Sequence, residues 1–106
     1  MKDTLADLTV DAFRTRLGNR FRIRLDPENA IETELIEARP LGDSRVSQKG
    51  SAPRRTPFAL LFRTSSMASL PQRIYCVEHD EMGAYDIFLV PVGPDGVGMV
   101  YEAIFT

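Results

Sequence analysis

The sequence predicts a mainly β protein: an antiparallel meander of about six strands that forms a small barrel or sandwich, with one short N-terminal helix. Three observations point to this fold. Apolar and polar residues alternate over residues 21–25, as in a strand with one buried face. Four further apolar segments fall between residues 58 and 105, separated by turn residues. A twisted sheet of this many strands, with little helix to cover it, tends to close on itself.

Length and composition favour one globular domain over residues 1–106. Of the 106 residues, 43% are hydrophobic and 26% charged, which suits a single packed core. The formal net charge of −2 argues against a protein that mainly coats nucleic acid, because binding phosphates requires a dominant basic surface. The first residues include acids where a signal peptide has an apolar run, no stretch approaches the roughly 20 apolar residues of a membrane helix, and the single cysteine, Cys76, cannot form an internal disulfide. We expect a soluble, cytoplasmic protein.

Residues 10–17 are predicted to form the one short helix. Thr9 is a suitable N-cap, and Gly18 is a natural stop. Apolar residues at positions i, i+3 and i+7 make a single stripe of Val10, Phe13 and Leu17. A helix of about two turns is not stable alone in water, so we expect this stripe to dock on the core and plug one end of the barrel.

The alternating segment 21–25 is predicted to pair with a second strand at residues 31–39. Asp, Pro, Glu and Asn at 26–29 form the turn between them. The alternation slips at Leu35-Ile36, which predicts a β-bulge or a strand covered on both faces near its end. A helix over residues 31–38 is the alternative, because Glu, Leu and Ala favour helix.

The C-terminal half supplies four more strands. Residues 58–63 are almost continuously apolar, which is typical of a strand covered on both faces. Residues 73–79 and 85–92 are joined by a short connection and predict a β-hairpin. The glycine- and proline-rich segment 91–98 predicts that the last strand, 99–105, folds back antiparallel on residues 85–90.

Residues 41–56 are predicted to form a mobile surface loop. They include Gly, Ser, Pro and Gln and almost no apolar side chains, so little holds them against the core. Their charges are mostly basic and include Arg54 and Arg55, which offer a contact for an acidic partner, a phosphate or nucleic acid. A solvated linker is the simpler interpretation, because the segment has neither an aromatic side chain for base stacking nor a glycine-rich phosphate cradle.

Several short motifs accompany these strands: Phe-Ala-Leu-Leu-Phe-Arg at 58–63, Leu-Pro-Gln at 70–72, Glu-His at 78–79, Phe-Leu-Val-Pro at 88–91 and Tyr-Glu-Ala-Ile-Phe at 101–105. As a set, and together with residues 13–21, they resemble DUF6916, a family of small uncharacterised bacterial proteins. The resemblance covers most of the chain outside the predicted loop. It implies a compact single domain without a known activity, and it favours an assembly role alongside phage-tail-like proteins over catalysis.

His79 is the only histidine and stands among acidic residues, as a general base or a metal ligand would. Adjacent side chains on a strand point to opposite faces, and no second histidine or cysteine completes a ligand set. We therefore predict that His79 shares the core face of Tyr75 and pins a turn by donating a hydrogen bond. Cys76 alternates to the other face with no base beside it, which predicts an inert thiol.

Glu102 is predicted to face solvent and to pair across the strands with an arginine. With Arg63 or Arg73 it would otherwise form a recognition patch on the barrel wall.

These patterns predict a non-enzymatic protein-interaction or assembly module that needs no cofactor and no metal. Its expected partner is another protein, and no catalytic residue is assigned. The candidate binding residues are Arg54, Arg55, Arg63, Arg73, His79 and Glu102. The alternative is a small-molecule-binding β-barrel or a minor enzyme using His79, which would require a polar pocket inside the barrel.

Overall fold

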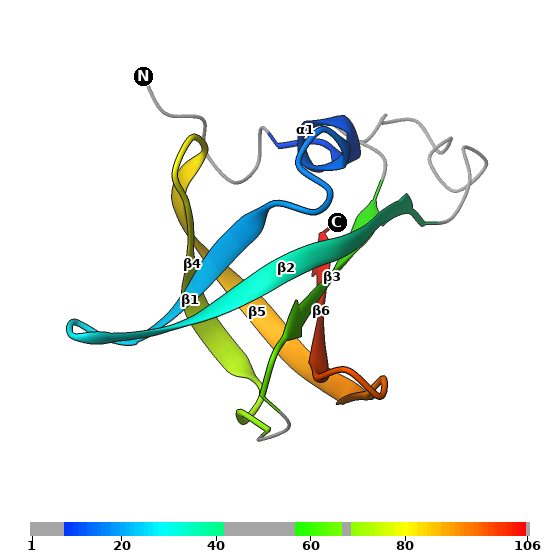
Figure 1. Ribbon diagram of the computed structural model, residues 1–106. Helices are drawn as coiled ribbons and strands as arrows, with labels where there is room; N and C mark the ends of the chain where they lie inside the picture. The colour runs from blue at the N-terminus through cyan, green and yellow to red at the C-terminus, as the bar shows by residue number, and fades with distance from the viewer. Residues whose placement is uncertain (1–7, 42–56, 67–68, 106) are drawn as a thin grey trace.

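Six antiparallel strands close into a barrel, and one short helix lies across one of its ends (Figure 1). The computed structural model describes residues 8–41, 57–66 and 69–105. The elements in chain order are α1 (Val10–Arg14), β1 (Arg20–Asp26), β2 (Asn29–Pro40), β3 (Phe58–Thr64), β4 (Arg73–His79), β5 (Gly83–Pro94) and β6 (Met99–Phe105). The predicted fold class is confirmed, and of the two predicted architectures the barrel is the one formed.

The strand order differs from a simple meander at the connection between β3 and β4. Around the barrel the order is β1-β2-β3-β6-β5-β4. Each half of the chain is a meander of three strands, but β3 pairs with β6 and β4 pairs with β1. The two meanders are therefore joined to each other along both of their outer strands.

The turn between β1 and β2 is organised by the carboxylate of Asp26. Its Oδ1 accepts hydrogen bonds from the backbone N–H of Glu28 at 2.8 Å and from the side-chain amide of Asn29 at 3.0 Å. These donors, Asn29 first, hold the pKa of the Asp26 carboxyl below its usual value. The hairpin predicted at this turn is confirmed.

A β-bulge interrupts β2 where the sequence alternation slips. In the pairing with β3, Leu35 lies opposite Phe62 and Glu37 lies opposite Leu61, which leaves Ile36 as the extra residue. The predicted bulge is confirmed, and the helix considered as an alternative for this segment is wrong. Cross-strand pairing satisfies the backbone of β2 on both sides, which outweighs the modest helix preference of Glu, Leu and Ala.

Apolar side chains from all six strands fill the barrel. Every strand contributes at least one side chain that is 3% exposed or less; examples are Ile23, Leu35, Leu60, Phe62, Val77, Leu89 and Ala103. Burial of each large aliphatic or aromatic side chain stabilises the fold by about 1.5–3 kcal/mol. At the start of β3 both faces are buried, since successive residues from Phe58 to Leu60 are at most 2% exposed, as the continuous apolar segment predicted.

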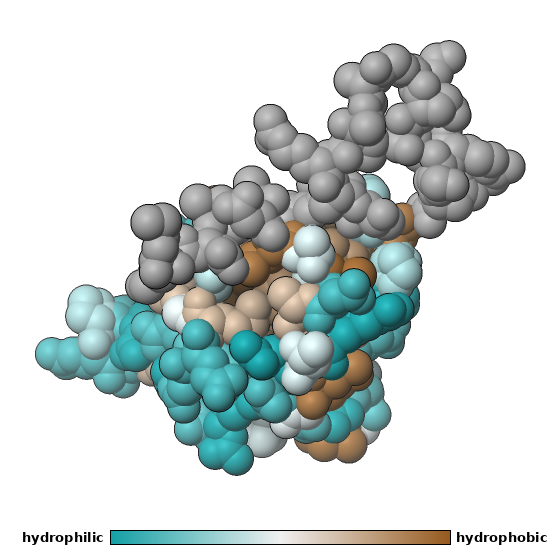
Figure 2. Space-filling view, turned by 90° about the horizontal axis from the view of Figure 1, so that it is seen from above, coloured by the Kyte–Doolittle hydropathy of each residue, from teal (hydrophilic) through white to brown (hydrophobic). Residues whose placement is uncertain are grey.

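Helix α1 closes one end of the barrel through Phe13, which is 1% exposed. The centroid of its ring lies 5.8 Å from those of Phe58 and Phe105 and 6.5 Å from that of Phe21. Phe58 and Phe105 stack on each other with centroids 4.6 Å apart. Seen from above this end (Figure 2), apolar residues gather near the centre, with polar residues to their left and right. The predicted plug is confirmed.

The helix is shorter than predicted and its apolar stripe ends early. It stops at Arg14, and turns follow up to Gly18, whose φ is +85°. Leu17 therefore leaves the helical face that Phe13 occupies and is 45% exposed. Its predicted role in docking is wrong. Thr9 occupies the N-cap position but makes no side-chain capping bond.

The chain leaves the barrel after β2 and re-enters before β3 at a single point. The backbone N–H of Leu41 donates a hydrogen bond to the carbonyl oxygen of Pro57 at 2.7 Å. The predicted mobile loop, 41–56, lies outside the described residues apart from Leu41. In the described part of the chain, no helix combines the length and apolar character that crossing a membrane requires.

Candidate binding surface

The binding residues predicted from the sequence do not converge on one site. Arg54 and Arg55 lie outside the described residues. His79 is buried at one end of the barrel, whereas Glu102 belongs to its outer wall, between the buried residues Tyr101 and Ala103. Nor does a group of three potential metal ligands come together within the segments that the structure describes.

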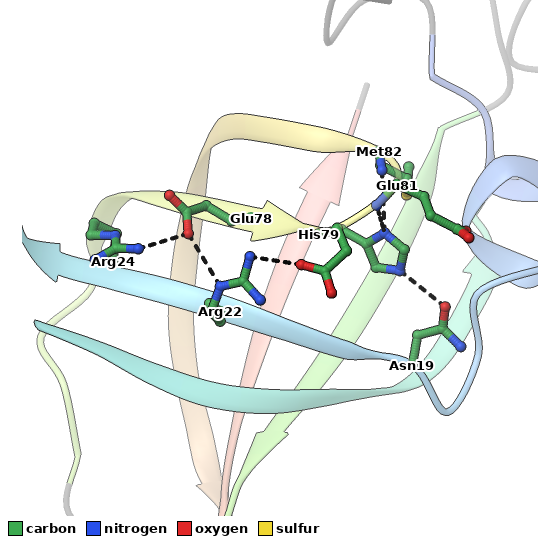
Figure 3. Close-up of polar contacts among 8 residues, drawn as sticks. Asn19, Arg22, Arg24, Glu78, His79, Glu81 and Met82 are labelled. Atoms are coloured by element: carbon green, nitrogen blue, oxygen red, sulfur yellow. Dashed lines mark hydrogen bonds and ion pairs between the residues drawn. The ribbon is translucent and has the colours of Figure 1, made fainter.

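His79 fastens the turn between β4 and β5 to the segment that precedes β1 (Figure 3). Its Nδ1 accepts hydrogen bonds from the backbone N–H groups of Glu81 at 3.0 Å and Met82 at 3.2 Å. Its Nε2 lies 2.9 Å from Oδ1 of Asn19. Because Nδ1 accepts, the network assigns the proton to Nε2, which donates to Asn19. The predicted turn-pinning role is confirmed, although the ring accepts from the turn and does not donate to it.

Burial lowers the pKa of His79 below 6.5, and the positive charge of Arg16 acts in the same direction. With both ring nitrogens occupied and the side chain almost fully enclosed, His79 is poorly placed to serve as a general base.

The same shift predicts a pH-dependent stability. The unfolded chain binds a proton at His79 more readily than the native protein, so the melting temperature should fall as the pH drops through 6.5. His79→Gln removes this titration and should flatten the profile between about pH 7.5 and 5.5, at a lower melting temperature throughout. Calorimetry across that range checks it. Equal slopes for the two proteins would contradict the assignment, because the chain has one histidine.

Arginines and acidic side chains form ion pairs on the outer wall of β1 and the strands beside it. Glu78 Oε1 accepts hydrogen bonds from Arg24 at 2.9 Å and Arg22 at 3.3 Å, and Arg22 also reaches Asp80 at 3.0 Å (Figure 3). The two arginines lower the pKa of Glu78, with the hydrogen bond from Arg24 as the largest cause. Both arginines are therefore paired with carboxylates of the same chain.

Arg63 anchors the turn between β5 and β6 and is not a free cation. Its guanidinium lies 2.9 Å from Asp95 and 3.5 Å from Glu34. Asp95 Oδ1 also accepts the backbone N–H groups of Val97 and Gly98. Arg63 first, and then these amides, lower the pKa of Asp95 to about 2.

Beside Arg63 lies a groove of about 540 Å³. Most of its lining residues are polar or charged. The full lining is Gly18, Arg20, Glu32, Thr33, Glu34, Arg63, Thr64, Ser65 and Val97. Both of its arginines already pair with glutamates of β2, since Arg20 lies 3.3 Å from Glu32. Among the described residues that line it, the groove therefore offers no unpaired cation to an anionic ligand.

Among the described residues, Glu102 does not form the predicted pair with an arginine. The register places it opposite Leu61 on one side and Val90 on the other, while Arg63 lies opposite Val100. Arg73 is also engaged elsewhere, with its guanidinium carbon 5.0 Å from the centroid of the Tyr75 ring. Arg63 lies two positions along β3 from the partner of Glu102 and already pairs with Asp95 and Glu34, so the recognition patch of Glu102 with Arg63 or Arg73 stays a prediction.

Cys76 is a free cysteine on the outer side of β4. Burial, followed by the negative charge of Glu78, raises the pKa of its thiol. A raised pKa leaves less of the nucleophilic thiolate at neutral pH, which agrees with the inert role predicted from the sequence.

The outer wall of β4, β5 and β6 carries exposed large apolar side chains, which the outer wall of β1 and β2 lacks among the described residues. Six large apolar side chains in the described segments are strongly exposed, and four of them belong to these three strands: Ile74 at 64%, Phe88 at 50%, Val92 at 52% and Ile104 at 51%. We call these four residues the apolar face. Ile74 and Phe88 are direct cross-strand partners. On the other side of β5, Val90 lies opposite Glu102 of β6. Two residues back along β5 and two residues forward along β6, the same register places Phe88 level with Ile104.

Sequence reasoning missed the apolar face, although a signal was present. In each of these strands an apolar residue occupies the outward position beside a buried one: Ile74 precedes Tyr75, Phe88 precedes Leu89, and Ile104 precedes Phe105. In a strand with one face exposed to solvent, outward positions are expected to be polar.

A family model for a domain of unknown function, DUF6916, matches residues 8–105. The chain belongs to the DUF6916 family. The match confirms the resemblance noted in the sequence. No curated protein and no solved structure matches the chain.

In this DUF6916 domain, two tyrosines tie the segment before β4 to the barrel. The hydroxyl of Tyr101 accepts the backbone N–H of Leu70 at 2.8 Å, and that of Tyr75 donates to the carbonyl oxygen of Pro71 at 2.6 Å. Both rings are at most 3% exposed, so each tyrosine packs in the core and satisfies a backbone group at the barrel end.

Proposed function

We propose that this DUF6916 domain is a non-enzymatic protein-binding module that docks another protein on the apolar face. The exposure of Ile74, Phe88, Val92 and Ile104 on adjacent strands carries the proposal. Single exposed apolar side chains are ordinary, but several on one wall typify interaction sites. In the part of the chain that the structure describes, the opposite wall carries paired arginines and glutamates and exposes no comparable apolar group.

A small-molecule site is supported less well. Apolar side chains occupy the barrel interior, and the groove beside Arg63 has a polar lining whose charges already pair. Pockets for small molecules are mostly apolar with a few converging polar groups. A catalytic role for His79 with Glu102 would require the two side chains to meet, and they belong to the inside and the outside of the barrel.

The cellular setting that we propose is the bacterial cytoplasm, within an assembly that includes phage-tail-like proteins. This part rests on the family resemblance, to which the free thiol of Cys76 adds compatibility with a reducing compartment.

Site-specific photo-crosslinking in the native cell tests the proposal. A photoreactive phenylalanine analogue at position 88 should yield one discrete crosslinked protein, whereas the same analogue at Ala30, an exposed position of β2, should not. With that protein purified, calorimetric titration should show that Phe88→Ser weakens binding at least about tenfold. Arg20→Ser serves as the matched control and should leave affinity unchanged. It is an exposed change on the outer wall of β1 and its neighbouring strands, which we call the charged wall.

Two results would overturn the proposal. One is crosslinking that is absent at position 88 or equal at positions 88 and 30. The other is a Phe88→Ser variant that binds the purified protein as tightly as the wild type. Because Phe88 is half exposed, the substitution should change the melting temperature little, and a circular dichroism melt separates lost binding from lost folding.

A further inference from the structure

Two carboxylates, those of Asp86 and Glu102, border the apolar face. Asp86 precedes Phe88 by two residues on β5, and Glu102 precedes Ile104 by two residues on β6, so each carboxylate shares the outward side of its strand with an apolar-face residue. Within the segments that the structure describes, neither carboxylate forms an ion pair. A partner that covers the face therefore meets negative charge at its borders.

The charged wall behaves differently. There Glu32, Glu34 and Glu78 each lie within 3.5 Å of an arginine nitrogen of the same chain. The carboxylates next to the apolar face are thus available for an external cation, whereas those of the opposite wall are already neutralised.

The number of apolar side chains on the apolar face indicates the size of the partner's contact. A stable interface between two globular proteins takes about 20–30 residues a side. Four apolar side chains are few for such an interface. Their number matches the four apolar positions i, i+3, i+4 and i+7 by which one amphipathic helix is recognised. Each strand of the face has a neighbour on both sides in the closed barrel, which favours recognition through side chains over addition of a strand.

We propose that the apolar face binds a basic amphipathic helix of the partner, an inference that rests on the proposed function. The helix lays its apolar stripe over Phe88 and Ile104. Its flanking lysines or arginines pair with Asp86 and Glu102. Such pairs at the border of an interface set the orientation of the partner and the rate of association more than they add affinity.

Two designed peptides test the charge of the partner. Both are synthetic, about 18 residues long, and carry leucines at helical spacing, with either lysines or glutamates on the flanks. Titration into the ¹⁵N-labelled domain should shift amide resonances of β4, β5 and β6. The lysine peptide should bind about tenfold more tightly than the glutamate peptide at low salt, and about 0.5 M NaCl should reduce this preference.

The double variant Asp86→Asn/Glu102→Gln should reduce the preference to about threefold or less. Glu32→Gln, on the charged wall, is the matched control and should keep the full preference. Equal binding of the two peptides, or a preference that survives in the double variant, would overturn the basic helix and leave the docking face intact. Shifts confined to β1 and β2, or no binding of either peptide, would also overturn it. The proposed function fails separately, through the crosslinking and the affinity of Phe88→Ser for the purified protein.

Discussion

Replacing Phe13 with alanine should lower the free energy of unfolding by about 3–5 kcal/mol, the range for truncating a large aromatic side chain in a core. Phe13 is 1% exposed, and its ring contacts those of Phe21, Phe58 and Phe105 at one end of the barrel. The truncation leaves a cavity that three other rings border. Urea denaturation, followed by circular dichroism, measures the change.

Leu17→Ala is the matched control, because the sequence alone assigned Leu17 to the same stripe while the structure leaves it 45% exposed. Its effect should stay within about 0.5 kcal/mol, the range for a surface substitution. Similar losses for the two variants would contradict the structural assignment. If Phe13→Ala does not fold, Phe13→Leu retains much of the volume and should still lose more stability than Leu17→Ala.

Gly98→Ala should destabilise the protein by at least about 3 kcal/mol, the upper end of the range for overpacking. A Cβ at this position would overlap the backbone carbonyl oxygen of Thr64, which cannot rotate away as a flexible side chain would. Near this point the backbone N–H of Met99 also donates to the carbonyl oxygen of Ser66 at 3.0 Å. Relief of the overlap would therefore disturb the place where β6 begins beside the end of β3.

Gly96→Ala, in the same turn, separates steric overlap from backbone strain. Gly96 has φ +92° with open space around it, so alanine there should cost about 1–2 kcal/mol for the left-handed conformation alone. Urea denaturation of both variants gives the comparison. A Gly98→Ala variant as stable as Gly96→Ala would show that the β5–β6 turn moves freely away from β3.

Local patterns predicted the strands but not the order in which they meet. Alternation over 21–25, the slip at Leu35-Ile36 and the turn residues between strands all depend on neighbours in the sequence, and each is found in the structure. The pairing of β3 with β6 joins residues about forty positions apart, such as Phe62 and Tyr101. Such a contact depends on how the two meanders close, and a polar connection after β3 does not determine it.

The candidate site was less predictable than the fold. His79 could be placed on the core face by counting along its strand, but its partner Asn19 is sixty residues away. The direction of its hydrogen bonds follows from how the turn directs the backbone N–H groups of Glu81 and Met82 at Nδ1. Glu102 could be placed on the outer wall, yet its lateral neighbours follow from cross-strand register, which the sequence of one strand does not specify. The apolar face also depends on which strands become neighbours.

The hydrogen bond between Leu41 and Pro57 makes the junction of β2 and β3 a suitable place for protein engineering. The two chain ends at this junction are joined by a 2.7 Å bond, so a folded insert whose own termini lie close together would impose little strain on the barrel. A fluorescent reporter inserted there would leave every strand continuous. Because β4, β5 and β6 lie later in the chain, it would label the protein without changing the sequence of the apolar face.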